Sequence, residues 1–251
     1  MNKKRPKLSI VIPAYNEEGS IADIVHALYS TLQDQDIEHE ILVVNDHSKD
    51  NTLDVLEKLA PDVPTLRVET NISPNGFGYA VRYGLDRFSG DCVAVMMADL
   101  SDDPLDLVRF YNRLCEDDLD CVFGSRFIKG GTIVDYPLYK KMANRVANTI
   151  VRYVMRIKYN DCTNAFKLYR RSTIEGIKPF LSPHFNLTLE LPLKAIVRGY
   201  SYAILPNSWH NRKSGESKLK IREMGSRYFF ILLYCFIEKY FSMGDFEKKW
   251  N

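Results

Sequence analysis

Short runs of apolar residues alternate along this chain with longer segments in which apolar residues recur every three or four positions. The runs cover positions 8–12, 41–44 and 92–97, and positions 66–69 predict a further short strand. Continuous apolar runs are typical of parallel strands buried on both faces, and the longer period is typical of amphipathic helices. Regular alternation of the two predicts βαβ units. We therefore expect an α/β fold with a mostly parallel central sheet flanked by helices.

The second half of the sequence is less regular but continues the same pattern. It predicts strands at 120–124, 165–169 and 200–205, and helices at 107–115, 138–157 and 188–197. In the long helix at 138–157, the spacing of the apolar residues predicts an inner face made of Met142, Val146, Ile150 and Val154. A last apolar helix follows at 221–241. We expect one large domain over 1–220 and a C-terminal amphipathic helical extension over 221–251.

Composition excludes several classes of protein. The net charge of +2 over 251 residues is too small to argue for nucleic acid as a partner. Five cysteines without a CxxC pair favour a reducing compartment and argue against a zinc site. The basic N-terminus leads directly into a strand and does not resemble a signal peptide. The longest apolar run, at 228–237, is about half the ~20 residues that span a bilayer.

The most informative stretch is VAVMMADLSDDP at 93–104, where an apolar run ends in acidic residues. Ligands of open α/β sheets bind beyond the carboxyl ends of the strands. Asp99, Ser101 and Asp102 offer oxygen ligands that suit Mg²⁺ or Mn²⁺. The alternative is that Asp102 or Asp103 caps the next helix, with Pro104 at its first position.

Five motifs, in order, carry a resemblance to a known family. They are SIVIPAYNEEGSI at 9–21, ILVVNDHSKDNT at 41–52, NGFGYAVRYG at 75–84, ADLSDDP at 98–104 and GSRFIKGG at 124–131. Together they resemble glycosyltransferase family 2, whose GT-A fold is a single nucleotide-binding α/β domain. HNRKSGESKL at 210–219 is similar to a loop of the polyprenol-phosphate sugar transferases, the subgroup of dolichol-phosphate mannose synthase.

This resemblance implies a nucleotide-diphosphate sugar as donor, either GDP-mannose or a UDP-sugar. Pro13, Tyr15 and Glu17 would frame the base and ribose, and Asp46 would contact the nucleoside. A carboxylate at a strand end suits a ribose hydroxyl or a base N–H. The alternative for Glu17 is a favourable charge in the first turn of a helix.

The resemblance also implies a divalent cation on the donor diphosphate. Asp99 would hold it, with help from Ser101 or Asp102. The subgroup usually has an aspartate two places earlier, where this chain has Met97. Because a thioether is a poor ligand for Mg²⁺, we expect weak affinity for the cation.

On the acceptor side, the resemblance implies that Arg126, Lys140, Asn144 and Arg145 hold the phosphate of a polyprenyl phosphate. Arginine pairs with phosphate through two parallel hydrogen bonds. The alternative for Lys140 is a solvated helix face. Arg212 and Lys218 lie in a Gly-containing loop that would close over the diphosphate; the alternative is an ordinary basic surface loop.

The chemistry of the acceptor predicts the mechanism. A polyprenyl monophosphate is already anionic near pH 7 and needs no general base. We expect one inverting displacement at the anomeric carbon. The first alternative is transfer to a glycan hydroxyl, which would need a base such as Asp102 or Asp103; Glu190 is the nearest match to the acidic pair of such enzymes. The second is a catalytically impaired protein that only binds nucleotide sugars.

A polyprenyl acceptor requires access to a membrane surface. The segment at 224–241 is aromatic and aliphatic, and basic residues precede it. This pattern predicts an interfacial helix and a peripheral protein on the cytoplasmic face of a membrane. A membrane subunit or a homodimer is also a candidate partner. The alternative is a terminal helix that packs on the core.

Overall fold

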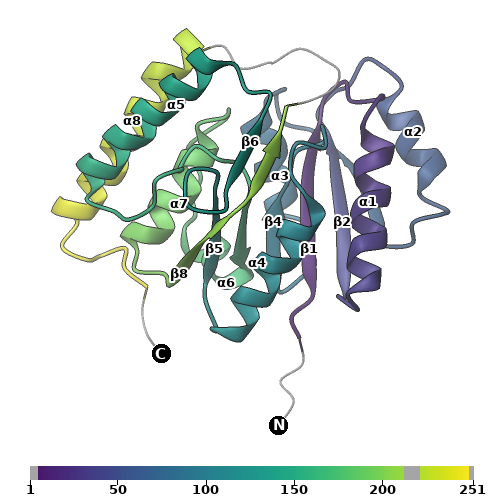
Figure 1. The fold of residues 1–251 in the computed structure, drawn as a ribbon, viewed down its shortest axis with the longest axis horizontal. Helices are drawn as coiled ribbons and strands as arrows, with labels where there is room; N and C mark the ends of the chain where they lie inside the picture. The colour runs from purple at the N-terminus through teal and green to yellow at the C-terminus, as the bar shows by residue number, and fades with distance from the viewer. Residues whose placement is uncertain (1–4, 212–220, 249–251) are drawn as a thin grey trace.

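A seven-stranded sheet forms the centre of the molecule, with helices on both faces (Figure 1). The computed structural model describes residues 5–211 and 221–248. The strands of this sheet are β1 (Leu8–Ala14), β2 (His39–Asn45), β3 (Leu66–Thr70), β4 (Cys92–Val95), β5 (Cys121–Ser125), β7 (Lys167–Arg170) and β8 (Tyr202–Pro206). The helices are α1 (Ile21–Asp34), α2 (Thr52–Leu59), α3 (Phe77–Leu85), α4 (Pro104–Glu116), α5 (Leu138–Met155), α6 (Arg171–Gly176), α7 (Leu187–Val197) and α8 (Ile221–Phe241).

The strand order is β3-β2-β1-β4-β7-β5-β8. All neighbours pair in parallel except β7, which runs antiparallel to both β4 and β5. The predicted α/β class with a mostly parallel sheet is thus confirmed. Since β1, β2, β4 and β5 are fully buried, their near-continuous apolar sequences follow from contact with helices on both sides.

A second, two-stranded sheet pairs β6 (Thr132–Val134) with β9 (Ser208–His210). These strands are only three residues long, and apolar patterning did not predict them. The backbone N–H of His210 donates to the carbonyl of Ser101 (2.9 Å), and Asp102 forms a bridge with Trp209. The small sheet therefore joins the acidic loop after β4 to the loop after β5.

Two hydrophobic clusters fill the space on the two faces of the large sheet. Helices α1, α2 and α4 cover one cluster, and α3, α7 and α8 cover the other. Helix α8 contributes the buried side chains of Ile231 and Cys235. Its Glu238 pairs with Arg198 (2.7 Å) in a buried salt bridge. The C-terminal helix is therefore packed into the core of the fold along one side.

The predicted inner face of α5 is wrong. Met142, Val146, Ile150 and Val154 are 60%, 59%, 51% and 38% exposed. The side chains that α5 buries are Asn148, Val151 and Met155 instead. The helix turns a polar residue inward because Asn148 forms hydrogen bonds with Thr163 in the loop that follows. Its apolar face consequently points outward, although no helix within 5–211 or 221–248 is long and apolar enough to cross a membrane.

Candidate active site

The acidic loop follows β4 at the carboxyl edge of the sheet. Asp99 begins it, and its carboxylate accepts a hydrogen bond from the backbone N–H of Ser101 (3.1 Å). Leu100 between them has a φ of 57°, in the left-handed region that a leucine seldom adopts. Buried neighbours on both sides of this residue hold the turn in place. The backbone thus bends so that Asp99, Ser101 and Asp102 lie in one buried turn.

Asp102 is the most perturbed carboxyl group of this turn. Burial, and next the charge of Asp99, raise its pKa to about 7. Neither Asp102 Oδ1 nor Ser101 Oγ has a hydrogen-bond partner among the residues that the structure describes. Buried oxygens without partners are costly unless a ligand satisfies them. Two carboxylates and a hydroxyl therefore fit a hard divalent cation, which would fill its other positions with phosphate or water.

No three His, Cys, Asp or Glu side chains converge in the described part of the chain as a metal-binding group. The protein donors are thus fewer than in a dedicated metal cage. Met97, two places before Asp99, is half-buried and offers only a sulfur as a ligand.

Asp103 has a different role from its neighbours. Its side chain accepts a hydrogen bond from the N–H of Leu105 (2.9 Å), and Pro104 is the first residue of α4. The capping alternative is therefore confirmed for Asp103. Asp106, one turn further, accepts a hydrogen bond from the N–H of Ser208 (2.6 Å) and fastens β9 to α4.

Arg126 follows β5 and is held by Asp161. Its Nε and Nη2 donate to the two carboxylate oxygens of Asp161 (2.9 and 2.8 Å), and its backbone N–H donates to the same carboxylate (3.0 Å). Burial lowers the pKa of Arg126, but the pairing with Asp161 outweighs it and the pKa is raised. The charge of Arg126 also acts on Asp102. Sequence analysis missed Asp161. Its position in a polar loop between a helix and a strand is the only feature of the sequence that could have pointed to it.

Two further predicted acceptor residues lie beside Arg126. The guanidinium groups of Arg126 and Arg145 both approach the ring of Phe127, at 5.5 and 4.9 Å from its centroid. Asn144 accepts a hydrogen bond from Thr163 (2.8 Å), two residues beyond Asp161. Lys140 lies one helical turn before Asn144 and is half-buried. The structure thus brings this set together at the start of α5.

Asp46 organises the turn that precedes α3. Its Oδ1 accepts from Asn71 (2.7 Å), and its Oδ2 accepts from the N–H of Gly76 (2.8 Å) and from Asn75 (3.1 Å). The side chain is buried. Gly76 has a φ of 157° and approaches Pro183 so closely that a β-carbon would clash with its carbonyl. Contact of Asp46 with the nucleoside stays a prediction, since its hydrogen bonds already serve this turn.

The predicted base and ribose contacts surround the carboxyl end of β1. Pro13 is buried within the strand, whereas Tyr15 and Glu17 are half-buried in the loop that follows. The N–H of Glu17 donates to Thr52 Oγ1 (2.9 Å), so this loop is fastened to the start of α2. Pro13, Tyr15, Glu17 and Asp46 therefore share one edge of the sheet with Asp99. Arg212 and Lys218 lie outside the described residues.

Glu190, the nearest match to the acidic pair of enzymes that use a sugar hydroxyl, is a structural residue in this fold. Its carboxylate accepts hydrogen bonds from the N–H groups of Leu181 and Ser182 (2.7 Å each) and pairs with Lys194 (2.7 Å). Both charged side chains are completely buried. A carboxylate enclosed in this way has no path to a substrate hydroxyl, so Glu190 does not supply a general base.

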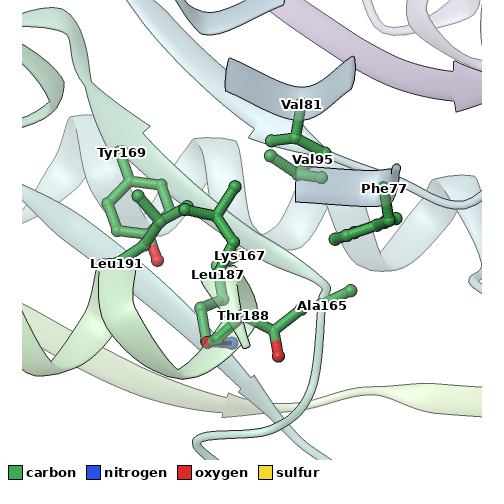
Figure 2. A pocket seen from close by; sticks show the side chains of 9 residues that line it. All are labelled: Phe77, Val81, Val95, Ala165, Lys167, Tyr169, Leu187, Thr188 and Leu191. Carbon is green, nitrogen blue, oxygen red and sulfur yellow. Dashed lines mark hydrogen bonds between the residues drawn. The ribbon is translucent and has the colours of Figure 1, made fainter. Parts of the chain in front are cut away.

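Lys167 is a second buried charge that sequence analysis missed. Its ammonium donates to the carbonyls of Cys162 and Thr188 (3.1 Å each) and also to that of Asn164. Burial lowers its pKa to about 7. Figure 2 shows it beside Thr188 and Ala165, lining a small and mainly apolar pocket between α3 and α7. Lys167 thus ties the loop that carries Asp161 to the first turn of α7.

Comparison with known proteins agrees with this geometry. Residues 9–177 match the signature of glycosyl transferase family 2. The chain belongs to glycosyltransferase family 2. Among its relatives, the dolichol-phosphate mannosyltransferase of Pyrococcus furiosus is 30% identical over 85% of this chain and 59% of its own length. The polyprenol monophosphomannose synthase of Mycolicibacterium smegmatis is 29% identical over 84% of this chain and 80% of its own.

The fold is also that of solved glucosyl-3-phosphoglycerate synthase structures. Glucosyl-3-phosphoglycerate synthase from Mycobacterium tuberculosis, in complex with Mn²⁺, UDP-glucose and phosphoglyceric acid, superposes with a TM-score of 0.70 at 18% identity. The match covers 92% of this chain and 80% of that one. The predicted family, its GT-A fold and the resemblance to the polyprenol-phosphate subgroup are thus confirmed. The chain spans only about three fifths of the Pyrococcus relative.

Proposed function

We propose that this family 2 protein transfers a sugar, with inversion, from a nucleotide-diphosphate sugar to a polyprenyl monophosphate. The observation that carries the proposal is the juxtaposition of two opposite charges at one sheet edge. The buried acidic turn with Asp102 lies within electrostatic reach of Arg126, which is itself held rigidly by Asp161. One side suits a diphosphate neutralised by a cation, and the other suits a second phosphate. The names of the two relatives support this assignment.

On the donor side, Asp99, Ser101 and Asp102 would hold Mg²⁺ or Mn²⁺ against the diphosphate. When bound, such a cation supplies Lewis-acid stabilisation of the departing nucleoside diphosphate. Pro13, Tyr15, Glu17 and Asp46 would position the nucleoside at the ends of β1 and β2. Arg212 and Lys218 are proposed to contact the diphosphate.

On the acceptor side, Arg126 needs only part of its hydrogen-bonding capacity for Asp161. Its Nη1 group makes no hydrogen bond within 5–211 or 221–248, so it retains donors for a phosphate oxygen. Arg145 shares the ring of Phe127 with Arg126, and Lys140 and Asn144 lie in the same half of α5 as Arg145. These groups would orient a phosphate that is already ionised, and its oxygen would attack the anomeric carbon without a general base.

A second candidate function is transfer to a sugar hydroxyl. The observation that favours it is Asp102, whose pKa of about 7 and unpartnered Oδ1 suit a general base. The burial of Glu190 argues in the other direction, because it removes the acidic residue at the position closest to the usual base. We favour the phosphate acceptor for this reason.

The deciding experiment offers a panel of radiolabelled GDP- and UDP-sugars to the protein with a short-chain polyprenyl phosphate, in Mg²⁺, Mn²⁺ or EDTA. We expect label from one donor to enter the organic phase, with an inverted anomeric configuration and a loss of activity in EDTA. Donor hydrolysis without a lipid product would move the assignment to a hydroxyl acceptor. Binding of a donor without any turnover would identify a nucleotide-sugar-binding protein.

We also propose that the protein binds peripherally to a membrane through the outer faces of α5 and α8. The two helices lie side by side along one side of the molecule (Figure 1). Both carry large exposed apolar side chains, among them Ile150 and Tyr153 on α5 and Phe229, Leu233 and Ile237 on α8. Scattered exposed apolar residues are ordinary, but a continuous patch marks an interaction surface.

We propose that the protein binds the cytoplasmic face of the membrane, because nucleotide sugars are the expected donors there. Sedimentation with lipid vesicles tests membrane binding. Gel filtration in the same buffer tests whether a second copy of the chain covers these helix faces instead. A stable dimer that hides these faces and does not bind vesicles would replace the membrane proposal.

A further inference from the structure

A groove outside the candidate active site lies between the C-terminal ends of α5 and α8 and the start of β8. Its volume is about 520 Å³. Three basic residues line it, Arg156 and Lys158 after α5 and Lys239 near the end of α8. The other lining residues are Ile157, Ile196, Tyr202 and Ile204. The groove therefore combines a cationic rim with an apolar floor.

This groove is separate from the site at the carboxyl edge of the sheet. Arg145, beside Arg126, lies in the first half of α5, whereas Arg156 follows its last residue. Eleven residues of helix separate the two by roughly 16 Å. Tyr202 is the first residue of β8 and pairs with Cys121, the first of β5, so the groove lies toward the amino end of the strands. None of its lining residues contributes to the proposed catalytic site.

The positive charges of the groove have no acidic partner in the described part of the chain. Arg156 and Lys158 are exposed, and neither forms a side-chain hydrogen bond or a salt bridge within 5–211 or 221–248. Lys239 is half-buried, and its ammonium donates to the carbonyl of Met155 at the end of α5. Among the residues that the structure describes, no acidic residue lines the groove. The neighbouring Glu238 is already paired with Arg198. Three unneutralised cations around one hollow favour an anion.

The apolar floor indicates an anion that carries a hydrophobic part. Ile196, Tyr202 and Ile204 are half-buried, so they present apolar surface to the groove. Both helices also carry exposed apolar side chains near their C-terminal ends, Tyr153 and Val154 on α5 and Tyr240 and Phe241 on α8. A free inorganic anion would leave all this surface in water, whereas an acyl chain would cover it.

We propose that this groove binds the headgroup of an anionic phospholipid. Its phosphate contacts Arg156, Lys158 and Lys239, and the first part of its acyl chains lies on Ile196, Tyr202 and Ile204. The site does not take part in sugar transfer. It fixes how the protein sits on the lipid surface, and so it adds a specific lipid contact to the general membrane affinity of α5 and α8.

The test titrates the 251-residue protein with monomeric dihexanoyl phosphatidylglycerol, using calorimetry below the micelle concentration. Dihexanoyl phosphatidylcholine and inorganic phosphate are the comparison ligands. We expect saturable binding of the phosphatidylglycerol, at least tenfold tighter than either. The double variant Arg156→Gln, Lys158→Gln should weaken it on the order of thirtyfold, since each basic residue near an anionic lipid contributes about a factor of five.

The matched control removes the same charge elsewhere, with Lys58→Gln on α2 and Arg82→Gln on α3, and should leave lipid binding unchanged. All replaced side chains are at least partly exposed, so equal melting temperatures verify folding. Sugar transfer to a soluble short-chain acceptor should not change in the groove variant, which separates this proposal from the proposed catalysis. Equal affinity of the groove variant and the wild type would overturn the proposal. So would equal binding of phosphatidylcholine, or of inorganic phosphate, which would indicate a soluble ligand.

Discussion

Asp102 has the most strongly shifted pKa among the carboxyl groups at the carboxyl edge of the sheet. Its pKa rises from 3.8 to about 7 on folding, chiefly because burial disfavours the charged form. Between these two values the folded protein holds a proton that the unfolded chain releases. Stability therefore falls as the pH rises through this window, and above about 7 the folded state carries the full penalty of a buried charge.

Replacing Asp102 by asparagine should relieve this penalty. We expect Asp102→Asn to raise the melting temperature of the cation-free protein, by more at pH 8 than at pH 5, because only at pH 8 is the wild-type carboxyl ionised in the fold. The gain at pH 8 corresponds to a few kcal/mol. Thermal unfolding in EDTA at both pH values measures it. An equal gain at the two pH values would show that Asp102 is not a titrating group in this range.

The same variant separates the two proposed functions. If Asp102 acts as a ligand of a cation, added Mn²⁺ should restore part of the lost transfer activity. If it is a general base, activity should fall about 10²–10⁴-fold and excess cation should not restore it. Asp103→Asn serves as the control, because an asparagine oxygen can still cap α4 through Leu105, so this variant should change neither stability nor turnover appreciably.

The pair of Arg126 and Asp161 predicts a large effect on stability. Asp161→Asn removes a fully buried carboxylate and leaves the guanidinium of Arg126 without its partner. We expect a loss of about 3 kcal/mol in the free energy of unfolding, and reduced acceptor affinity, because the uncompensated charge remains buried. Denaturant unfolding and the KM for the acceptor measure the two effects.

Asp117→Asn is the matched control, because it breaks an exposed pair with Arg113 on α4 (2.7 Å). Such surface pairs contribute about 0–1 kcal/mol. If both variants lost the same small amount of stability, the buried pair would not be essential to the site.

Individual residues were predictable from the sequence where a motif placed them at a strand end. Asp99 and Arg126 each follow a buried apolar run, so their position at the ligand-binding edge could be predicted. Asp161 and Lys167 could not be found in this way. Asp161 acts through Arg126, which lies 35 residues away in the chain. Lys167 acts through hydrogen bonds to backbone carbonyls. Such contacts leave no periodic signal in one sequence.

At the level of elements, α5 shows what periodicity can and cannot predict. The apolar residues at helical spacing correctly predicted a long helix. They did not predict its rotation, because the same pattern is produced by an apolar face turned to the core or to a lipid surface. Asn148, a polar residue on the buried side, decides the rotation through its hydrogen bonds with Thr163.

The outward face of α5 leads to a direct prediction. Ile150→Ser should lower the partition of the protein onto vesicles on the order of thirtyfold, since a lipid-covered isoleucine contributes about 2 kcal/mol. It should lower the melting temperature only slightly, because half of the side chain is already in water. Leu105→Ser on α4 replaces a comparably exposed apolar residue on another helix and should leave vesicle binding intact. Equal effects of the two variants would rule out α5 as a membrane contact.

At the scale of the whole molecule, the sheet edge and the C-terminal helix depend on each other. Helix α8 packs against α7, and α7 supplies Thr188, whose carbonyl accepts from Lys167. Tyr228 of α8 donates to the carbonyl of Phe185 (3.2 Å), just before α7. The helix that is proposed to contact the membrane is therefore also part of the support of the active-site loop.

This dependence predicts the outcome of shortening the chain. A protein that ends at residue 220 should not fold stably, because it exposes the core around α7 and leaves Arg198 buried without Glu238. A protein that ends at Phe241 keeps α8 and loses only the terminal segment with the pair of Lys248 and Asp120 (2.9 Å), so it should remain folded with a slightly lower melting temperature. Circular dichroism melts of the two truncated proteins distinguish them. A cooperative and active protein from 1–220 would instead establish the boundary at 220 and make α8 a separable extension.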